Sequence, residues 1–198
     1  MKTVKSIIVA SKVTILPFHF SKCFFESQTG YQEQETDVGK DCVPAMDIYR
    51  RLTELEIQLP PLPPLAGIFQ RVKQIGNLLY VSGQGPTENG IPLVTGKVGK
   101  ERTIEEGQYA ARACVLNALS VLHDYLGDLN QIKSVVKLLA FVASAEGFGR
   151  QPEVANGASQ LLLDIFGPER GVGARSAIGT NELPDNITAE IEFIFELY

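Results

Sequence analysis

The segment Ala174–Tyr198 holds the side chains best suited to chemistry. From Ile187 to Leu197 every second residue is apolar, which is typical of a strand with one buried face. The opposite face carries three carboxylates, Glu190, Glu192 and Glu196. Arg175 lies in a strand-like piece just upstream, and the turn residues between the two pieces favour their pairing as a hairpin-like unit. A guanidinium would then lie near a row of carboxylates, and the simplest interpretation is an ion pair on a solvated face.

Three further strands are expected to support this segment. Ile68–Ile75 alternates in polarity, and Gly76-Asn77 supplies a two-residue hairpin turn. The returning strand Leu78–Ser82 is continuously apolar, which predicts burial on both of its faces. Val135–Ala143 is also apolar on both faces except at Lys137, so we expect it to be a central strand.

Two helices are expected between the strands. Thr103-Ile104-Glu105-Glu106 is a capping box that opens a helix to Leu126, closed by Gly127. A second helix should begin at Pro152 and end at Phe166. The predicted buried stripe of the first helix is Ala111, Cys114, Ala118, Val121, Leu122 and Tyr125. The order β-β-α-β-α-β-β, with two helices on one sheet face, indicates an α+β fold whose bare sheet face needs a partner.

Composition excludes several classes of function. The 198 residues carry a formal charge of −5, which argues against an electrostatic grip on nucleic acid. The three cysteines have no metal-ligand spacing and the two histidines are far apart, so we expect no metal and no cofactor. An odd cysteine count without a disulfide framework favours a reducing compartment, here the cytoplasm. No apolar run near the N-terminus reaches the roughly 18 uncharged residues of a membrane span.

The N-terminal quarter differs from the rest of the chain. Residues 1–44 include a polar, acidic stretch without periodicity and are expected to be a disordered extension, before a domain at 45–198. An upstream-extended start before Met46 is the preferred interpretation, and a targeting peptide is the alternative. Asp47–Ile57 should form a short amphipathic helix. Leu59–Pro64 is expected to be a rigid extended connector, with a PxxP ligand as the alternative.

Two motifs resemble the RidA family (YjgF/YER057c/UK114, also labelled endoribonuclease L-PSP). The Ala-Arg-Ser segment at Arg175, the Leu-Pro turn and the final Glu-Ile-Glu strand resemble the end of that family. Gly76–Gln84, an apolar strand running into Ser-Gly-Gln, is similar to its other signature. The resemblance covers about Leu65 to Tyr198. It implies the chorismate mutase-like fold, a mixed sheet with two helices on one face, assembled as a homotrimer with clefts between subunits.

The resemblance also implies residue roles. Family members deaminate reactive enamine and imine intermediates to keto acids and ammonia. Arg175 would bind the substrate carboxylate and Glu190 would hold or activate the hydrolytic water. The positions expected to line the site are Phe69, Ser82, Gly83 and Asn156.

Three departures from the family pattern leave the activity open. Phe69 stands where the family often has an active-site tyrosine. Gly173 and Ala177 stand where the family often has Pro before and Cys after Ala-Arg-Ser. The Asp47–Pro64 entry exceeds the length of the compact family, so the chain resembles a longer, divergent branch. The function that the resemblance implies is that of a 2-iminobutanoate/2-iminopropanoate deaminase. The alternative is a non-catalytic binding module for small carboxylates such as keto or imino acids.

Overall fold

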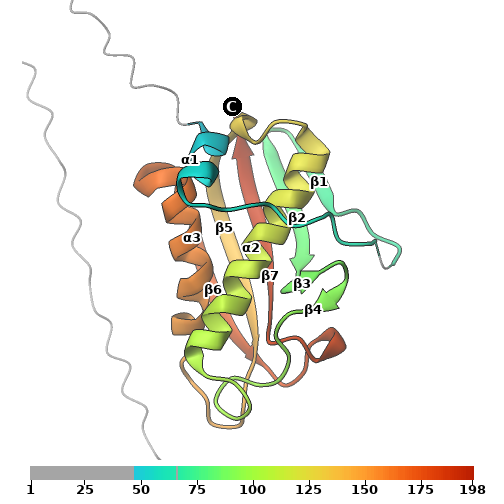
Figure 1. Cartoon of the computed structure of the whole chain (residues 1–198), viewed down its shortest axis with the longest axis vertical. Coiled ribbons are helices and arrows are strands. Elements are labelled where there is room, and N and C mark those ends of the chain that lie inside the picture. The colour runs from blue at the N-terminus through green and yellow to red at the C-terminus, as the bar shows by residue number, and fades with distance from the viewer. Residues whose placement is uncertain (1–46, 66) are drawn as a thin grey trace, which may run out of the picture. The chain divides into compact units, whose positions relative to one another are not determined.

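The computed structural model describes residues 47–65 and 67–198, which form a five-stranded sheet with helices packed against it (Figure 1). The expected extension at 1–44 and the preferred start at Met46 lie outside the described residues. The helices are α1 (Ile48–Glu54), α2 (Ile104–Leu126) and α3 (Gln151–Gly171), with short 3-10 turns η1 (Leu129–Gln131) and η2 (Pro184–Asn186). The strands are β1 (Val72–Ile75), β2 (Leu78–Gln84), β3 (Thr87–Glu88), β4 (Ile91–Pro92), β5 (Ile132–Ala143), β6 (Ala174–Thr180) and β7 (Ala189–Leu197).

The sheet is mixed and has the strand order β1-β2-β7-β5-β6. Strands β5 and β6 are parallel, joined through α3, and the other neighbours are antiparallel. The expected hairpin-like pairing of the Arg175 strand with the final strand is therefore wrong, because β5 lies between β6 and β7. The central position predicted for β5 is confirmed, and it separates β6 from β7.

One face of the sheet is covered and the other is bare. The inward side chains of β7, Ile191, Phe193 and Phe195, are fully buried in one core with α2 and α3. Glu190 and Glu192 alternate with them and so lie on the opposite face. The predicted α+β class, with two helices on one sheet face, is confirmed. Helix α1 adds a third helix to the same core.

Helix α2 begins and ends as its sequence predicts. Thr103 and Glu106 make a reciprocal capping box, and Gly127 closes the helix in the left-handed conformation with a φ of 74°. The predicted stripe is buried except at Tyr125, which is exposed and bonds Gln74 through its hydroxyl. That position lies in the last turn, where the helix passes the end of β1.

Two strand predictions are wrong in extent or burial. The first strand covers Val72–Ile75 only, because the residues before it bend and Ile68 and Phe69 are exposed. The Gly76-Asn77 turn is confirmed, with Gly76 at a φ of 60°. Strand β2 is buried on one face only, and Tyr80 lies on the bare face with 40% of its surface exposed.

The segment before β1 is fastened to the domain. Asp47 caps α1, Ile48 and Leu52 are buried in the core, and the predicted short helix is confirmed. The proline-rich segment then crosses α2 (Figure 1). Its carbonyls are bonded at Pro60 by Ser120 and at Pro63 by Arg71. Because both carbonyl oxygens are engaged, this segment is part of the fold.

Replacing Ile48 with alanine should destabilise the domain. Because the side chain is fully buried, we expect the free energy of unfolding to fall by about 2–4 kcal/mol. Urea denaturation measures this, with Arg50→Ala on the exposed side of the same helix as the control. An equal effect of the two variants would contradict the packing of α1.

Candidate functional site

Arg175 lies on β6, an edge strand, and its side chain reaches helix α3. Arg175 and Phe193 are both register partners of Leu138, so the three side chains share the helix-covered face. One guanidinium nitrogen, Nη1, donates to Asn156 Oδ1 at 2.8 Å and to Ser159 Oγ at 3.0 Å. Both acceptors are uncharged, and Arg175 makes no ion pair with any described residue.

Helix α3 supplies both acceptors from adjacent turns. Asn156 and Ser159 are three residues apart, so they lie on one side of the helix. Between them Gly157 allows close packing against α2, since a Cβ there would lie 2.3 Å from the Gln108 carbonyl oxygen. Asn156 was predicted from the sequence, whereas Ser159 was not. No signal in the sequence distinguishes Ser159 from other polar residues of this helix, because only the placed Arg175 side chain selects it.

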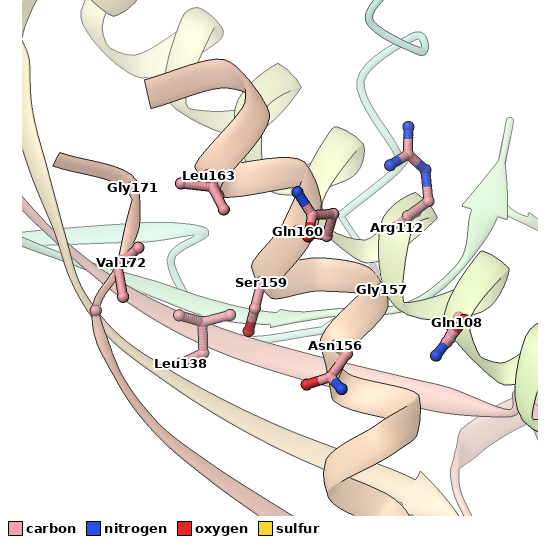
Figure 2. A pocket seen from close by; sticks show the side chains of 11 residues that line it. Gln108, Arg112, Leu138, Asn156, Gly157, Ser159, Gln160, Leu163, Gly171 and Val172 are labelled. Atoms are coloured by element: carbon pink, nitrogen blue, oxygen red, sulfur yellow. The ribbon is translucent and has the colours of Figure 1, made fainter. Parts of the chain in front are cut away.

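A surface cavity of about 560 Å³ adjoins these acceptors, and Figure 2 shows its lining. Asn156 and Ser159 lie on its rim on α3, while Arg112 and Gln108 belong to α2. The remaining lining residues are Leu138, Gly157, Gln160, Leu163, Gly171, Val172 and Gly173. Arg175, the candidate for binding a carboxylate, bonds two residues of this lining and therefore lies beside an open space.

Glu190 lies on the bare face near the start of β7. Burial raises the pKa of its carboxyl above the ordinary value, and the charge of Glu192 raises that pKa further. No described residue donates a hydrogen bond to it or pairs with it. A half-buried carboxylate without a fixed partner is free to bind water and to exchange a proton with it.

The Ser-Gly-Gln segment passes directly under this carboxylate. Pairing of β2 with β7 shifts register between Val81 and Gln84, so the strand bulges there. A Cβ on Gly83 would lie 2.1 Å from Glu190 Oε1, so only glycine leaves room for the carboxylate in this position. Ser82 donates its hydroxyl to the Gln70 carbonyl. It also lines a groove of about 300 Å³ with Tyr80 and Glu192 on the bare face.

Asn117 on α2 holds the turn that follows. Its Nδ2 donates to the carbonyl oxygens of Gly85 and Thr87, each at 2.8 Å. The side chain is 1% exposed, and its Oδ1 is buried without a hydrogen-bond partner among the described residues. The turn that follows the bulge is therefore held from the helix layer.

The sequence-predicted residues form two separate half-sites in one chain. Arg175 and Asn156 lie on the helix-covered side, whereas Ser82, Gly83 and Glu190 lie at the bare face. Glu190 is three residues along β7 from Phe193, the residue level with Arg175, which places it about 10 Å further along the strand. The expectation that Arg175 lies near the carboxylate row is wrong within a single chain.

Comparison with known proteins identifies the fold family. Residues 49–196 match the family model described as YjgF/chorismate mutase-like, putative endoribonuclease. The chain belongs to the RidA (YjgF) family. The N-terminal part before the fold is not covered by that match.

Several relatives of this RidA-family chain cover most of the described domain. Protein TCP17 of Trypanosoma cruzi is 42% identical over 146 residues, which is 74% of this chain and 91% of that protein. The crystal structure of Atu1372 from Agrobacterium tumefaciens is 42% identical, with a TM-score of 0.69, over 76% of this chain and 92% of that one. A protein from Shewanella oneidensis described as a putative endoribonuclease is 30% identical, with a TM-score of 0.73, over 76% and 99%.

Phe69, where the RidA family often has a tyrosine, does not share a groove with the other predicted site residues. Its ring is 48% exposed and lines a groove of about 510 Å³ with Arg71, Val121 and Tyr125, beside β1. Neither Arg175 nor Glu190 lines this groove. The hydroxyl of a tyrosine is absent there, so within the family pattern this position offers an apolar ring only.

The described residues offer little for metal or thiol chemistry. Within 47–65 and 67–198, no three or more His, Cys, Asp or Glu side chains cluster as metal ligands. Burial raises the pKa of the Cys114 thiol, which therefore stays protonated in the core. Among the helices that the structure describes, none is long and apolar enough to span a membrane.

Proposed function

We propose that this protein hydrolyses the reactive enamine and imine derivatives of small 2-amino acids to 2-keto acids and ammonia. Arg175 binds the substrate carboxylate, and Glu190 of a neighbouring copy binds and activates water. The proposal rests on the state of Glu190. Its carboxylate is half-buried, has a raised pKa and no partner among the described residues, and packs over Gly83. A carboxylate whose pKa is raised by burial is a stronger base than an ordinary glutamate, which favours proton transfer from water.

Assembly as a homotrimer is part of this proposal. The bare sheet face carries exposed apolar side chains, Ile75, Tyr80 and Ile178, and monomers seldom leave such a face in water. A cyclic trimer would bring the Arg175 edge of one chain to the Glu190 face of the next, forming three equivalent clefts. Light scattering should give three times the monomer mass, and a monomer at micromolar concentration would contradict the arrangement.

The reaction balances with water as the only co-substrate. Water adds to the carbon of the protonated imine and gives one proton to Glu190, so a neutral carbinolamine forms. Glu190 returns this proton to the nitrogen, and the C–N bond breaks with release of ammonia. The C=O bond of the keto acid forms as the carbinolamine hydroxyl gives its proton to the Glu190 carboxylate. The guanidinium of Arg175 fixes the carboxylate, so the imine carbon meets the water in one orientation.

The direct test is ammonia and keto-acid release from enzymatically generated 2-iminopropanoate. Turnover above the spontaneous rate supports deamination. Binding of pyruvate or 2-oxobutanoate without turnover would instead support the carboxylate-binding module. RNA cleavage, the activity in several relatives' names, is disfavoured by the net charge of −5 and by the absence of paired histidines in the sequence.

Gly83→Ala should impair the water site specifically. The new methyl group would occupy the space of Glu190 Oε1, so the carboxylate must swing away. We therefore expect a loss of turnover on the order of 10²-fold, the cost of a 1 Å misplacement of a reacting group. Gly149→Ala, where nothing lies within 4 Å of the added methyl, is the matched control. Full activity of the Gly83 variant would show that Glu190 need not lie there.

Phe69→Tyr tests the alternative function. If the native protein binds keto acids without releasing ammonia, and the tyrosine variant gains turnover, the missing hydroxyl explains a binding-only protein. Because Phe69 is exposed, the added hydroxyl should leave the melting temperature within about 2 °C. Equal turnover of both proteins would show that the phenol is dispensable.

A further inference from the structure

Arg175 is held differently from the ion-paired arginines of this chain. Arg102 pairs with Glu106 at 2.9 Å and Arg150 pairs with Glu153, so a carboxylate neutralises each of these guanidinium groups. Arg175 instead donates to an amide oxygen and a hydroxyl oxygen, which are neutral. The side chain is therefore fixed in place while its full positive charge stays available to an anion.

The hydrogens of the guanidinium are unevenly used. The group carries five N–H donors, one on Nε and two on each terminal nitrogen. Both hydrogens of Nη1 are engaged, one by Asn156 Oδ1 and one by Ser159 Oγ. Among the described residues nothing accepts from Nε or Nη2. The unused pair points along one edge of the planar group, with the parallel spacing that a carboxylate matches.

We propose that Asn156 and Ser159 are positioning residues that saturate Nη1, so that the ligand carboxylate binds side-on to Nε and Nη2. This inference rests on the proposed carboxylate-binding role of Arg175. It changes the role predicted for Asn156: its oxygen holds the arginine rather than the substrate. It also assigns Ser159, which neither the motifs nor the sequence spacing had placed at the site.

The proposal fixes the orientation of the ligand. A carboxylate bound end-on would use Nη1 and Nη2 together, but Nη1 has no free hydrogen while both acceptors are in place. The side-on edge therefore determines where the C2 atom of a 2-keto or 2-imino acid lies. Neutral acceptors matter for affinity as well, because a charged acceptor would compete with the ligand for the same cation.

Calorimetric titration of pyruvate into matched variants tests the positioning role. Ser159→Ala should raise Kd about 3–10-fold, the value of one ordinary intramolecular hydrogen bond, because the serine acts on the ligand only through Arg175. Ser159→Thr keeps a hydroxyl and should stay within about twofold. Asn156→Asp keeps the shape and the acceptor but adds a charge, and should raise Kd by about tenfold or more. Glu169→Ala, exposed at the end of α3, is the control and should leave Kd unchanged.

The side-on geometry has its own readout in the Nε–H resonance of Arg175, assigned by its loss in Arg175→Lys. Saturating pyruvate should move this proton downfield, and pyruvamide, which lacks the carboxylate, should not. The proposal is overturned if pyruvate saturates the protein without moving Nε–H, if Asn156→Asp binds pyruvate as wild type does, or if wild type binds no keto acid at millimolar concentration. If pyruvate binds with the expected changes in Kd and in the Nε–H shift but no ammonia is released, the deamination proposal is contradicted and the positioning role is supported.

Discussion

Replacing Glu190 with glutamine is expected to reduce ammonia release from 2-iminopropanoate by about 10²–10⁴-fold, the usual contribution of a positioned general base. The amide has nearly the same shape, so pyruvate affinity should stay within about threefold because Glu190 does not contact the carboxylate. Single-turnover assays and titration of pyruvate separate the two effects. An equal loss of both would mean that the substitution damages the fold of the site.

Because the pKa of Glu190 is raised, both the turnover and the stability of the wild-type protein should depend on pH, and Glu190→Gln tests this. As a base, Glu190 must be ionised, so wild-type turnover should rise with pH through a pKa higher than that of an ordinary glutamate. A raised folded-state pKa also means that the folded protein holds this proton more tightly than the unfolded chain does, so stability falls as pH rises through that pKa. Both dependences should disappear in Glu190→Gln, which should melt at or above the wild-type temperature at neutral pH.

Arg175→Ala is expected to weaken pyruvate binding by about 1.5–3 kcal/mol, which is roughly 10–150-fold in Kd. Lysine in its place should recover only part of the affinity, because an ammonium group lacks the paired N–H donors of the free edge. Titration by calorimetry measures both. Unchanged binding in Arg175→Ala would place the carboxylate elsewhere and would make this arginine an ordinary link between β6 and α3.

The same two variants test whether the half-sites combine between chains. In a mixed trimer, the cleft that joins Arg175 of the Glu190→Gln chain to Glu190 of the Arg175→Ala chain is intact. Unfolding and refolding equal amounts together should therefore restore about one quarter of wild-type activity, since three quarters of the trimers are mixed and each has one good cleft. No recovery, with both variants still trimeric, would contradict a shared site.

Local signals in the sequence predicted the elements well. The capping box at Thr103 and the glycine at Gly127 define α2 because these residues act on their own helix ends. The two-residue period from Ile187 onward predicted which face of β7 is buried, since burial of alternate side chains is a property of the strand itself. The identity of Arg175 and Glu190 as candidates followed from the family motifs, and the outward face of Glu190 followed from the period of β7.

The arrangement of the half-sites could not be predicted in the same way. Whether Arg175 meets Glu190 depends on strand order, and β5, far upstream in sequence, takes the place between their strands. The side of the sheet to which Arg175 points depends on the register of β6 against β5. Ser159 was missed because a single serine on a helix has no distinguishing pattern until the arginine that it bonds is placed next to it.

The two ends of the described domain meet at η1. The backbone N–H of Ile48 donates to Asn130 Oδ1, and that of Tyr198 donates to the Gln131 carbonyl, so neighbouring residues hold both ends (Figure 1). Glu190 lies eight residues earlier on β7, about 26 Å away along an extended strand. A short linker could therefore join the ends into a circularly permuted chain. A dye or surface tether attached at either end would stand clear of the chemistry, which suits this domain to immobilised and single-molecule formats.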